Sequence, residues 1–365
     1  MKIFKFFALA LLLLSPLAAA ESPSDASDRF MKRARQITFE GRRAGEGYFS
    51  ADGARLIFQS EREAGNPFYQ IYELDLESGE TRRLSNGVGK TTCAFARPGS
   101  REVLFASTHH DPRSGQLQKE ELEMRASGKE RRYAWDYDPE MELYVRNEEG
   151  TLRRMTSVRG YDAEASYSPD GKWIVYSSTR QAYDGSVEVD VEQMELDPSV
   201  YAELYLMPAD GGESRRLTFG LGYDGGPFFT ADSERVIWRR FDPQGLIADL
   251  WTIKLDGSDE RQITDFASMS WAPYPHPSGD YFVFTSNKHG FENFEIFIVD
   301  VAGKKEPQRV TFTDGFDGLP VFAPDGKRLA WTTNRGGGDG AQLWWAQWDH
   351  EAAKAALAAA PARGN

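Results

Sequence analysis

The sequence predicts an all-β fold: a six-bladed β-propeller of four-stranded antiparallel blades, closed by the N-terminal strand. Three observations predict it. A pair of motifs occurs six times with constant internal spacing, β-rich runs separate the two motifs, and the repeat period matches that of a propeller blade.

The motif pair consists of a basic-apolar-hydroxyl stretch and a tight turn that follows 14 positions later. The hydroxyl residues are Thr38, Ser85, Thr156, Thr218, Thr264 and Thr311, and the turn residues are Asp52, Gly99, Asp170, Asp232, Ser278 and Asp325. Successive copies are 47, 71, 62, 46 and 47 residues apart in both series. Because the two series keep step, each pair marks the same two points of one repeating unit.

The stretches between the motifs have the pattern of strands. Each turn leads into a β-rich run such as RLIFQS (55–60) or KWIVYSS, and a second, aromatic run such as IYELD (71–75) or LWTIK follows. With the run into the turn and the RRLT-type run, one unit has four strands. Four antiparallel strands repeated about every 45 residues predict a propeller blade.

The ring is expected to close through the N-terminus. The RRLT-type stretch occurs once before the first turn and is missing after the last. We therefore expect residues 36–38 to pair with the aromatic run at 343–345, so that the N-terminal strand is the outer strand of the final blade. This closure also removes the exposed edge that a linear stack of blades would leave.

The chain divides into four segments. Residues 1–20 have the pattern of a secretory signal peptide, with Lys2 and Lys5, an apolar core at 6–17, and cleavage after Ala20. An N-terminal linker (21–33), the propeller (34–348) and an Ala-rich C-terminal tail (349–365) follow. We expect a periplasmic or secreted protein without membrane insertion, because the apolar core is too short to span a bilayer comfortably.

Composition narrows the classes of partner. The formal net charge of −13 disfavours a nucleic-acid partner, which basic residues would have to recognise. Cys93 is the single cysteine, so the fold has no internal disulfide, and its position on an inner-strand run predicts a packed thiol.

Two long repeat spacings reveal insertions at 108–142 and 179–203, between the second and third strands of the second and third blades. Loops of this kind emerge on the same face as those that link successive blades. Adjacent insertions on one face are typical of a lid or a docking surface.

Six positions beyond each hydroxyl residue the chain is expected to reach the mouth of the central channel, where Asp162, Asp224 and Asp317 place three carboxylates. Ten positions beyond the turns lie Arg180 and Arg335, and His109 holds the same position in the second blade. The basic residues could simply neutralise the acidic ring. Alternatively, the ring binds Ca²⁺, another divalent cation or the cationic end of a ligand, or both rings contact a peptide or polar ligand.

His109 is followed by His110 and Asp111, a local cluster with the residue types of a metal site. Adjacent histidines in an extended segment point to opposite sides, which disfavours joint binding of one ion. His289 is the other histidine expected on this face. No cofactor is expected, and the sequence does not identify a metal.

The segments SYSPDGKWIVYSS, VFAPDGKRLAWTTNR and LYLMPADGGESRRLT resemble repeats of the TolB-like propeller family, also called PD40 or WD40-like repeats, over about residues 35–348. The resemblance implies the propeller fold. Its members act in translocation machinery, gate peptidases or stand alone. TolB carries a separate α/β domain before its propeller, whereas about 14 residues precede the first strand here after Glu21, so the resemblance implies a stand-alone member.

The sequence contains neither a G-x-S-x-G elbow nor an H-E-x-x-H motif. We therefore expect an exported, non-enzymatic scaffold that binds a protein or peptide at the channel mouth and the insertion-bearing face. One alternative is a metal-dependent polysaccharide lyase or hydrolase of the oligogalacturonate-lyase type, which would need a histidine-rich metal shell from a chain with 5 histidines. The other is an accessory propeller that gates a separately encoded peptidase.

Overall fold

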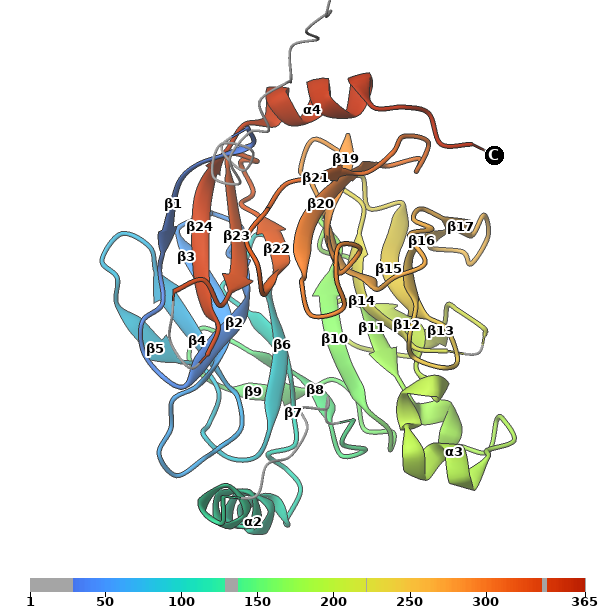
Figure 1. Cartoon of the computed structure of the whole chain (residues 1–365). Helices are drawn as coiled ribbons and strands as arrows, with labels where there is room; N and C mark the ends of the chain where they lie inside the picture. The colour runs from blue at the N-terminus through green and yellow to red at the C-terminus, as the bar shows by residue number, and fades with distance from the viewer. Residues whose placement is uncertain (1–28, 129–136, 221, 337–339, 365) are drawn as a thin grey trace, which may run out of the picture.

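The computed structural model describes residues 29–128, 137–220, 222–336 and 340–364. Six four-stranded antiparallel sheets stand around a common axis, and the innermost strands of neighbouring sheets contact one another around the ring (Figure 1). The predicted six-bladed propeller is confirmed.

The first three blades follow the chain from the axis outward. Blade one is β2 (Arg43–Phe49), β3 (Arg55–Glu61), β4 (Gln70–Asp75) and β5 (Thr81–Arg83). Blade two is β6 (Thr91–Ala96), β7 (Val103–Ser107), β8 (Glu142–Arg146) and β9 (Leu152–Arg154). Blade three is β10 (Asp162–Tyr167), β11 (Trp173–Ser178), β12 (Glu203–Pro208) and β13 (Arg215–Arg216).

The last three blades repeat this order, except that the final outer strand comes from the N-terminus. Blade four is β14 (Asp224–Phe229), β15 (Arg235–Phe241), β16 (Ala248–Lys254) and β17 (Arg261–Gln262). Blade five is β18 (Ser270–Pro275), β19 (Tyr281–Ser286), β20 (Glu295–Asp300) and β21 (Gln308–Arg309). Blade six is β22 (Asp317–Phe322), β23 (Arg328–Thr333), β24 (Gln342–Trp348) and β1 (Met31–Gln36).

The predicted closure is confirmed, because β1 pairs antiparallel with β24 in the register Gln36↔Trp344. The hydroxyl of Thr38 accepts a hydrogen bond from the Leu343 amide at 2.9 Å and extends this contact. The strand begins at Met31, three residues before the expected start of the propeller at 34. The reason is hydrophobic: Phe30 stacks on Trp348 with ring centroids 5.9 Å apart, and this buried contact holds the extra residues on the blade.

The structure divides the loops between two faces. We call the face that carries the connections between second and third strands, and between successive blades, the insertion face. Its long connections contain α2 (Ser114–Ala126), η1 (Arg180–Ala182), α3 (Val191–Leu196) and η2 (Pro198–Tyr201). Figure 1 shows α2 and α3 at one end of the ring and α4 (His350–Ala359) at the other.

The Ala-rich tail is packed against the propeller. Ala353, Ala356 and Leu357 of α4 join the hydrophobic cluster of blades five and six. The side chain of Asp349 caps the helix by accepting a hydrogen bond from the Ala352 amide at 3.0 Å. No helix in the described residues combines the length and apolar character needed to span a membrane.

Every innermost strand carries a β-bulge at the same place. In blade one, Glu46 and Gly47 together stand opposite a single residue of β3, between the pairs Gly45↔Gln59 and Tyr48↔Ile57. The same register shift occurs in the other five blades. At each bulge one residue has a left-handed backbone with φ between 49° and 58°; these residues, the bulge ring, are Glu46, Cys93, Glu164, Gly226, Ala272 and Leu319.

This conformation costs a non-glycine residue about 1–2 kcal/mol, and five of the six ring members are not glycine. Bulges turn a strand and redirect a side chain. The repeated strain therefore has a structural effect, which is to aim the bulge ring at the axis.

Candidate functional site: the axial cavity

A cavity of about 610 Å³ lies on the propeller axis and includes all six members of the bulge ring in its wall. Its outer part is formed by loops of the insertion face, among them Tyr137 and Ser199 from the two insertions. Because no loop of the opposite face is among the described lining residues, the cavity opens on the insertion face.

The floor of the cavity is aromatic. Tyr48 and Phe228 line it, and their ring centroids are 5.6 Å apart. Phe95 and Tyr274 pack against this pair, with centroids 5.3 Å from Tyr48 and 5.0 Å from Phe228 respectively. These four side chains come from four different blades and fill the middle of the channel, so the cavity is a pocket that ends at this layer.

Glu46 is the first polar feature of the wall. Its carboxylate accepts hydrogen bonds from the Gln59 amide at 2.8 Å and from the Tyr48 hydroxyl at 3.2 Å. Burial raises the pKa of Glu46 to about 7, a shift that the nearby charge of Glu164 increases and that hydrogen bonding from Cys93 and Tyr48 opposes. Glu46 can therefore exchange a proton near neutral pH.

Cys93 lies beside this carboxylate on the neighbouring blade. Its thiol is 3.1 Å from the Thr92 hydroxyl, and its amide donates to the side-chain oxygen of Gln59 at 3.3 Å. Burial, together with the charge of Glu46, raises the pKa of the thiol well above its ordinary value. The thiolate is thus disfavoured, which makes Cys93 a poor nucleophile and agrees with the prediction of a packed thiol.

Glu164, the second carboxylate of the bulge ring, is fully engaged within the chain. It pairs with Arg239 at 2.8 Å, accepts from the Gly226 amide at 2.6 Å, and is also bonded by the Tyr223 hydroxyl. Arg239 additionally donates to the Tyr223 hydroxyl at 2.6 Å and lies over its ring at 4.6 Å. The guanidinium passes so close to Gly226 that a Cβ there would collide with it.

The opposite wall is apolar. Trp271, Phe294 and Phe316 come from blade five and from the connection that leads to blade six, and they form a triangle of rings. Their centroids are 5.8 Å apart for Trp271–Phe294, 6.2 Å for Trp271–Phe316 and 5.8 Å for Phe294–Phe316. Ala272 and Leu319 continue this side toward the floor. One half of the cavity is therefore polar and acidic, and the other is aromatic.

The carboxylates predicted from the sequence lie elsewhere. Asp162, Asp224 and Asp317 begin the inner strands of blades three, four and six, where they are almost fully buried. None of the six predicted site residues is among the described residues that line the cavity. Burial raises the pKa of Asp162 and of Asp224 above the ordinary value, although their arginine partners oppose the shift.

Each of these carboxylates pairs with an arginine of the adjacent strand or the turn after it. Asp162 is 2.6 Å from Arg180, and Asp317 contacts Arg335 through both guanidinium positions. In blade four the position aligned with Arg180 is Asp242, but Arg240 forms a bidentate pair with Asp224 at 2.7 Å for both bonds.

These pairs correspond to the alternative in which basic residues neutralise the acidic ring. Direct contact of the six predicted residues with a ligand stays a prediction.

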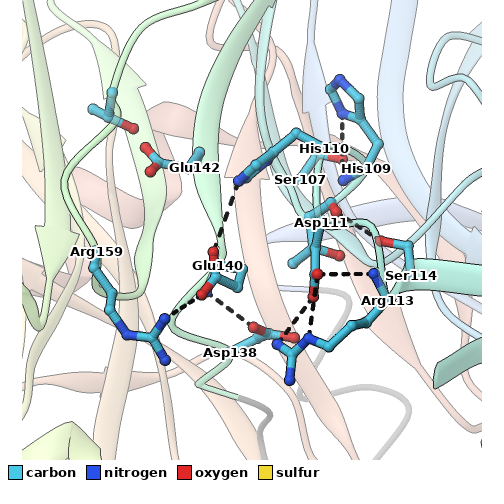
Figure 2. A network of polar contacts seen from close by, with 12 residues as sticks. Ser107, His109, His110, Asp111, Arg113, Ser114, Asp138, Glu140, Glu142 and Arg159 are labelled. Carbon is cyan, nitrogen blue, oxygen red and sulfur yellow. Dashed lines mark hydrogen bonds and ion pairs between the residues drawn. The ribbon is translucent and has the colours of Figure 1, made fainter. Parts of the chain in front are cut away.

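His109 lies in a polar network at the start of the first insertion (Figure 2). Its Nδ1 is 2.9 Å from the Ser107 hydroxyl, and its ring packs on Tyr144 with centroids 4.2 Å apart. His110 turns toward Glu140 instead, with Nε2 and the carboxylate oxygen 4.0 Å apart. Burial lowers the pKa of both histidines.

The acidic members of this network are paired with basic residues of the insertion or of neighbouring connections between blades. Asp111 binds Arg113 at 3.1 Å, Asp138 binds Lys90 at 2.8 Å, and Glu140 binds Arg159 at 2.5 Å. His289 belongs to blade five, where its ring stacks on Phe297. Within the described residues no group of three or more His, Cys, Asp or Glu side chains is arranged to hold a metal ion.

The sequence pattern contains a signal for the bulge ring. The ring lies eight positions beyond each hydroxyl residue, two beyond the predicted carboxylates. Aligning the repeats at that position reveals two glutamates, Glu46 and Glu164, and the single cysteine. The signal does not reveal that the bulge turns these residues, rather than their predecessors, into the cavity.

No family model matches the chain. Among curated proteins, an uncharacterized protein from Agrobacterium fabrum is 35% identical over 177 residues, which make up 45% of this chain and 52% of that protein. The match thus spans about half the length of this relative. It does not by itself identify an activity.

Solved structures share the fold. A putative TolB from Agrobacterium tumefaciens has a TM-score of 0.54 at 20% identity, covering 84% of this chain and 90% of that one. TolB from Acinetobacter baumannii has a TM-score of 0.56 at 15% identity, covering 82% and 65%. An oligogalacturonate lyase in complex with manganese has a TM-score of 0.52 at 15% identity, covering 87% and 94%. The fold is therefore that of TolB-like propellers, and at these identities the likeness concerns fold alone.

Proposed function

We propose that this protein is an exported binding propeller whose insertion face docks a protein or peptide and whose axial cavity receives one group of that partner. The proposal rests chiefly on an asymmetry of exposed apolar side chains. Ten of the eleven large apolar residues that are exposed in the described part of the chain lie on the insertion face: Phe39, Val88, Leu122, Val158, Val191, Leu196, Phe219, Leu246, Ile247 and Phe291.

The eleventh, Val301, is on the opposite face. Such a distribution is typical of an interaction surface, because scattered exposure would divide the apolar residues between both faces. The opposite face carries α4 and turns that are rich in Asp and Glu, including 255–260 (LDGSDE) and 147–151 (NEEGT). In the described part of the chain, the insertion face combines ten exposed apolar side chains with the mouth of the axial cavity.

The two insertions support the same assignment. Tyr137 and Ser199 extend the cavity wall outward, and Leu196 at the end of α3, near Ser199 in sequence, is 80% exposed. The insertions therefore connect the cavity to the surrounding surface. Direct contact of His109, Arg180 and Arg335 with a partner belongs to this proposal.

The proposal can be tested with a random peptide library displayed on phage and selected against the immobilised protein. Enriched peptides should bind the wild type in calorimetry and lose affinity by tenfold or more for the double variant Leu246→Glu, Phe291→Glu. The control is Val301→Glu, which adds one carboxylate on the opposite face and should leave affinity unchanged. Failure of any peptide to enrich, or equal loss in the control, would sink the proposal.

The lyase alternative is based on the fold that this chain shares with the manganese-bound structure. The same binding assay distinguishes this alternative from the proposed function. Metal analysis of the purified protein and an assay of oligogalacturonate cleavage with added Mn²⁺ test it directly. The peptidase-gating alternative predicts that a peptidase binds the insertion face and that the Leu246→Glu and Phe291→Glu substitutions abolish this binding. Export is tested by sequencing the mature N-terminus, since the predicted signal peptide lies outside the described residues.

A further inference from the structure

We infer that the group received by the axial cavity is an organic cation, an ammonium or guanidinium carried on an apolar stem, which Glu46 binds while the Trp271 side of the cavity packs the stem. This inference rests on the proposed function and names the chemistry of the ligand. It is carried by the positions of charges and rings in the cavity wall.

The first step concerns Glu46, which has no ion-pair partner within the described residues. The hydrogen bonds to its carboxylate come from neutral donors, Gln59, Tyr48 and Cys93. The cationic side chain that acts on its charge is Arg239, whose guanidinium is held by Glu164 and Tyr223. A carboxylate that faces a cavity without its own cation is a site for a cation supplied by a ligand.

The second step concerns the other charges of the wall. The described lining residues include four carboxylates, those of Glu46, Glu164, Asp197 and Asp242, and two guanidiniums, Arg43 and Arg239. Arg43 contacts Glu61 behind the wall, and Arg239 is bound to Glu164. The acidic excess disfavours an anionic ligand, which would have to displace one of these ion pairs.

The third step is the aromatic wall that blade five and the connection to blade six contribute to the same cavity. The triangle of Trp271, Phe294 and Phe316 offers ring faces and edges at 5.8–6.2 Å spacing. Rings attract cations through their negative faces and bind apolar stems by dispersion. The polar half and the aromatic half together match a ligand with a cationic end and an apolar body.

Ionisation of Glu46 adds a measurable signature. With a pKa near 7 in the free protein, the ionised fraction rises from about a tenth at pH 6 to about nine tenths at pH 8. Groups facing Glu46 are Tyr48, Cys93, Glu164 and Arg239. Tyr48 and Cys93 stay protonated in this range because burial raises the pKa of both side chains. Affinity for a cation should therefore increase about tenfold from pH 6 to pH 8.

The experiment uses three probes of matched shape on the full chain: phenylpropylammonium, phenylpropanol and phenylpropanoate, measured by ligand-observed NMR and calorimetry. We expect the ammonium to bind at least tenfold more tightly than the alcohol at pH 8, and the carboxylate to bind most weakly. Glu46→Gln should remove the preference and its pH dependence. Glu292→Gln, an exposed carboxylate on the same face, is the control and should change neither.

If Glu46→Gln does not fold, the charge series and the pH dependence of the wild type still decide the matter. Equal or tighter binding of the alcohol or carboxylate overturns the inference and leaves the proposed function standing. Binding of library peptides without binding of any of the three probes also overturns the inference and leaves the proposed function standing. Absence of both peptide and probe binding overturns both the inference and the proposed function.

Where enriched peptides and the ammonium probe both bind, acetylation of the peptide N-terminus shows whether the cation is a terminal ammonium or a Lys or Arg side chain.

Discussion

Replacing Glu46 by glutamine should stabilise the protein at high pH and have little effect at low pH. Glu46 has a folded-state pKa of about 7 against an ordinary value of 4.5, so the folded protein binds more protons than the unfolded chain between these values. Its contribution to stability is fully present below pH 4.5 and is lost as the pH rises through 7. Glutamine has nearly the same shape but cannot ionise.

The magnitude follows from proton linkage. Between pH 5 and pH 8, the shift from 4.5 to about 7 lowers the free energy of unfolding of the wild type by roughly 2–3 kcal/mol relative to a chain without this carboxylate. Contact of Glu46 with water in the cavity makes this an upper limit. Other carboxylates whose pKa is raised, such as Asp162 and Asp224, change the wild type and the variant alike.

Urea unfolding of the wild type and of Glu46→Gln at pH 5, 6, 7 and 8 measures the difference directly. The difference in free energy of unfolding should increase steadily with pH and favour the variant. A difference that does not depend on pH would refute the assigned pKa, and one that decreases would mean that the folded state stabilises the ionised form.

Two further substitutions test the structure around the cavity and the opposite face. Gly226→Ala should destabilise the protein by more than the roughly 1 kcal/mol of a left-handed backbone, because the new Cβ displaces Arg239 from Glu164. Gly171→Ala is the control, since its φ is also positive at +71° but a Cβ there meets no atom within 4 Å; equal losses in urea unfolding would contradict the contact. Leu357→Ala should cost about 2–4 kcal/mol because it removes a buried side chain of α4 from the core. If thermal melting shows no more loss than for the exposed Lys354→Ala, the helix does not pack as described.

The sequence determined the fold because strand pairing in this propeller is almost entirely local. Each blade is a run of consecutive antiparallel strands joined mostly by short turns, so the residues that specify it lie within one repeat. The single long-range pairing, between β1 and β24, was also predictable, because one outer strand was missing at the end and present at the beginning. Hydrophobic periodicity and turn residues carry this information.

Only the tertiary structure decided which side chains form the site. Asp162 and Glu164 are two residues apart on one strand, and an unbroken strand would turn both toward the same side. The bulge separates them: Asp162 pairs with Arg180 outside the cavity, and Glu164 lines it. Bulges depend on contacts between the strands rather than on a recognisable sequence pattern, so alignment of the repeats could not show where each carboxylate would point.

The same limit applies to charge pairing and to the tail. Alignment placed Asp242 opposite the acidic ring in blade four, whereas β15 brings Arg240 into register with Asp224. The Ala-rich tail favours a helix, but a helix of 10 residues is marginal in water by itself, and α4 is held by burial of Leu357 against the blades. Sequence periodicity thus fixes which residues pair within a blade, while packing between blades determines which charges reach the axis and which are neutralised beside it.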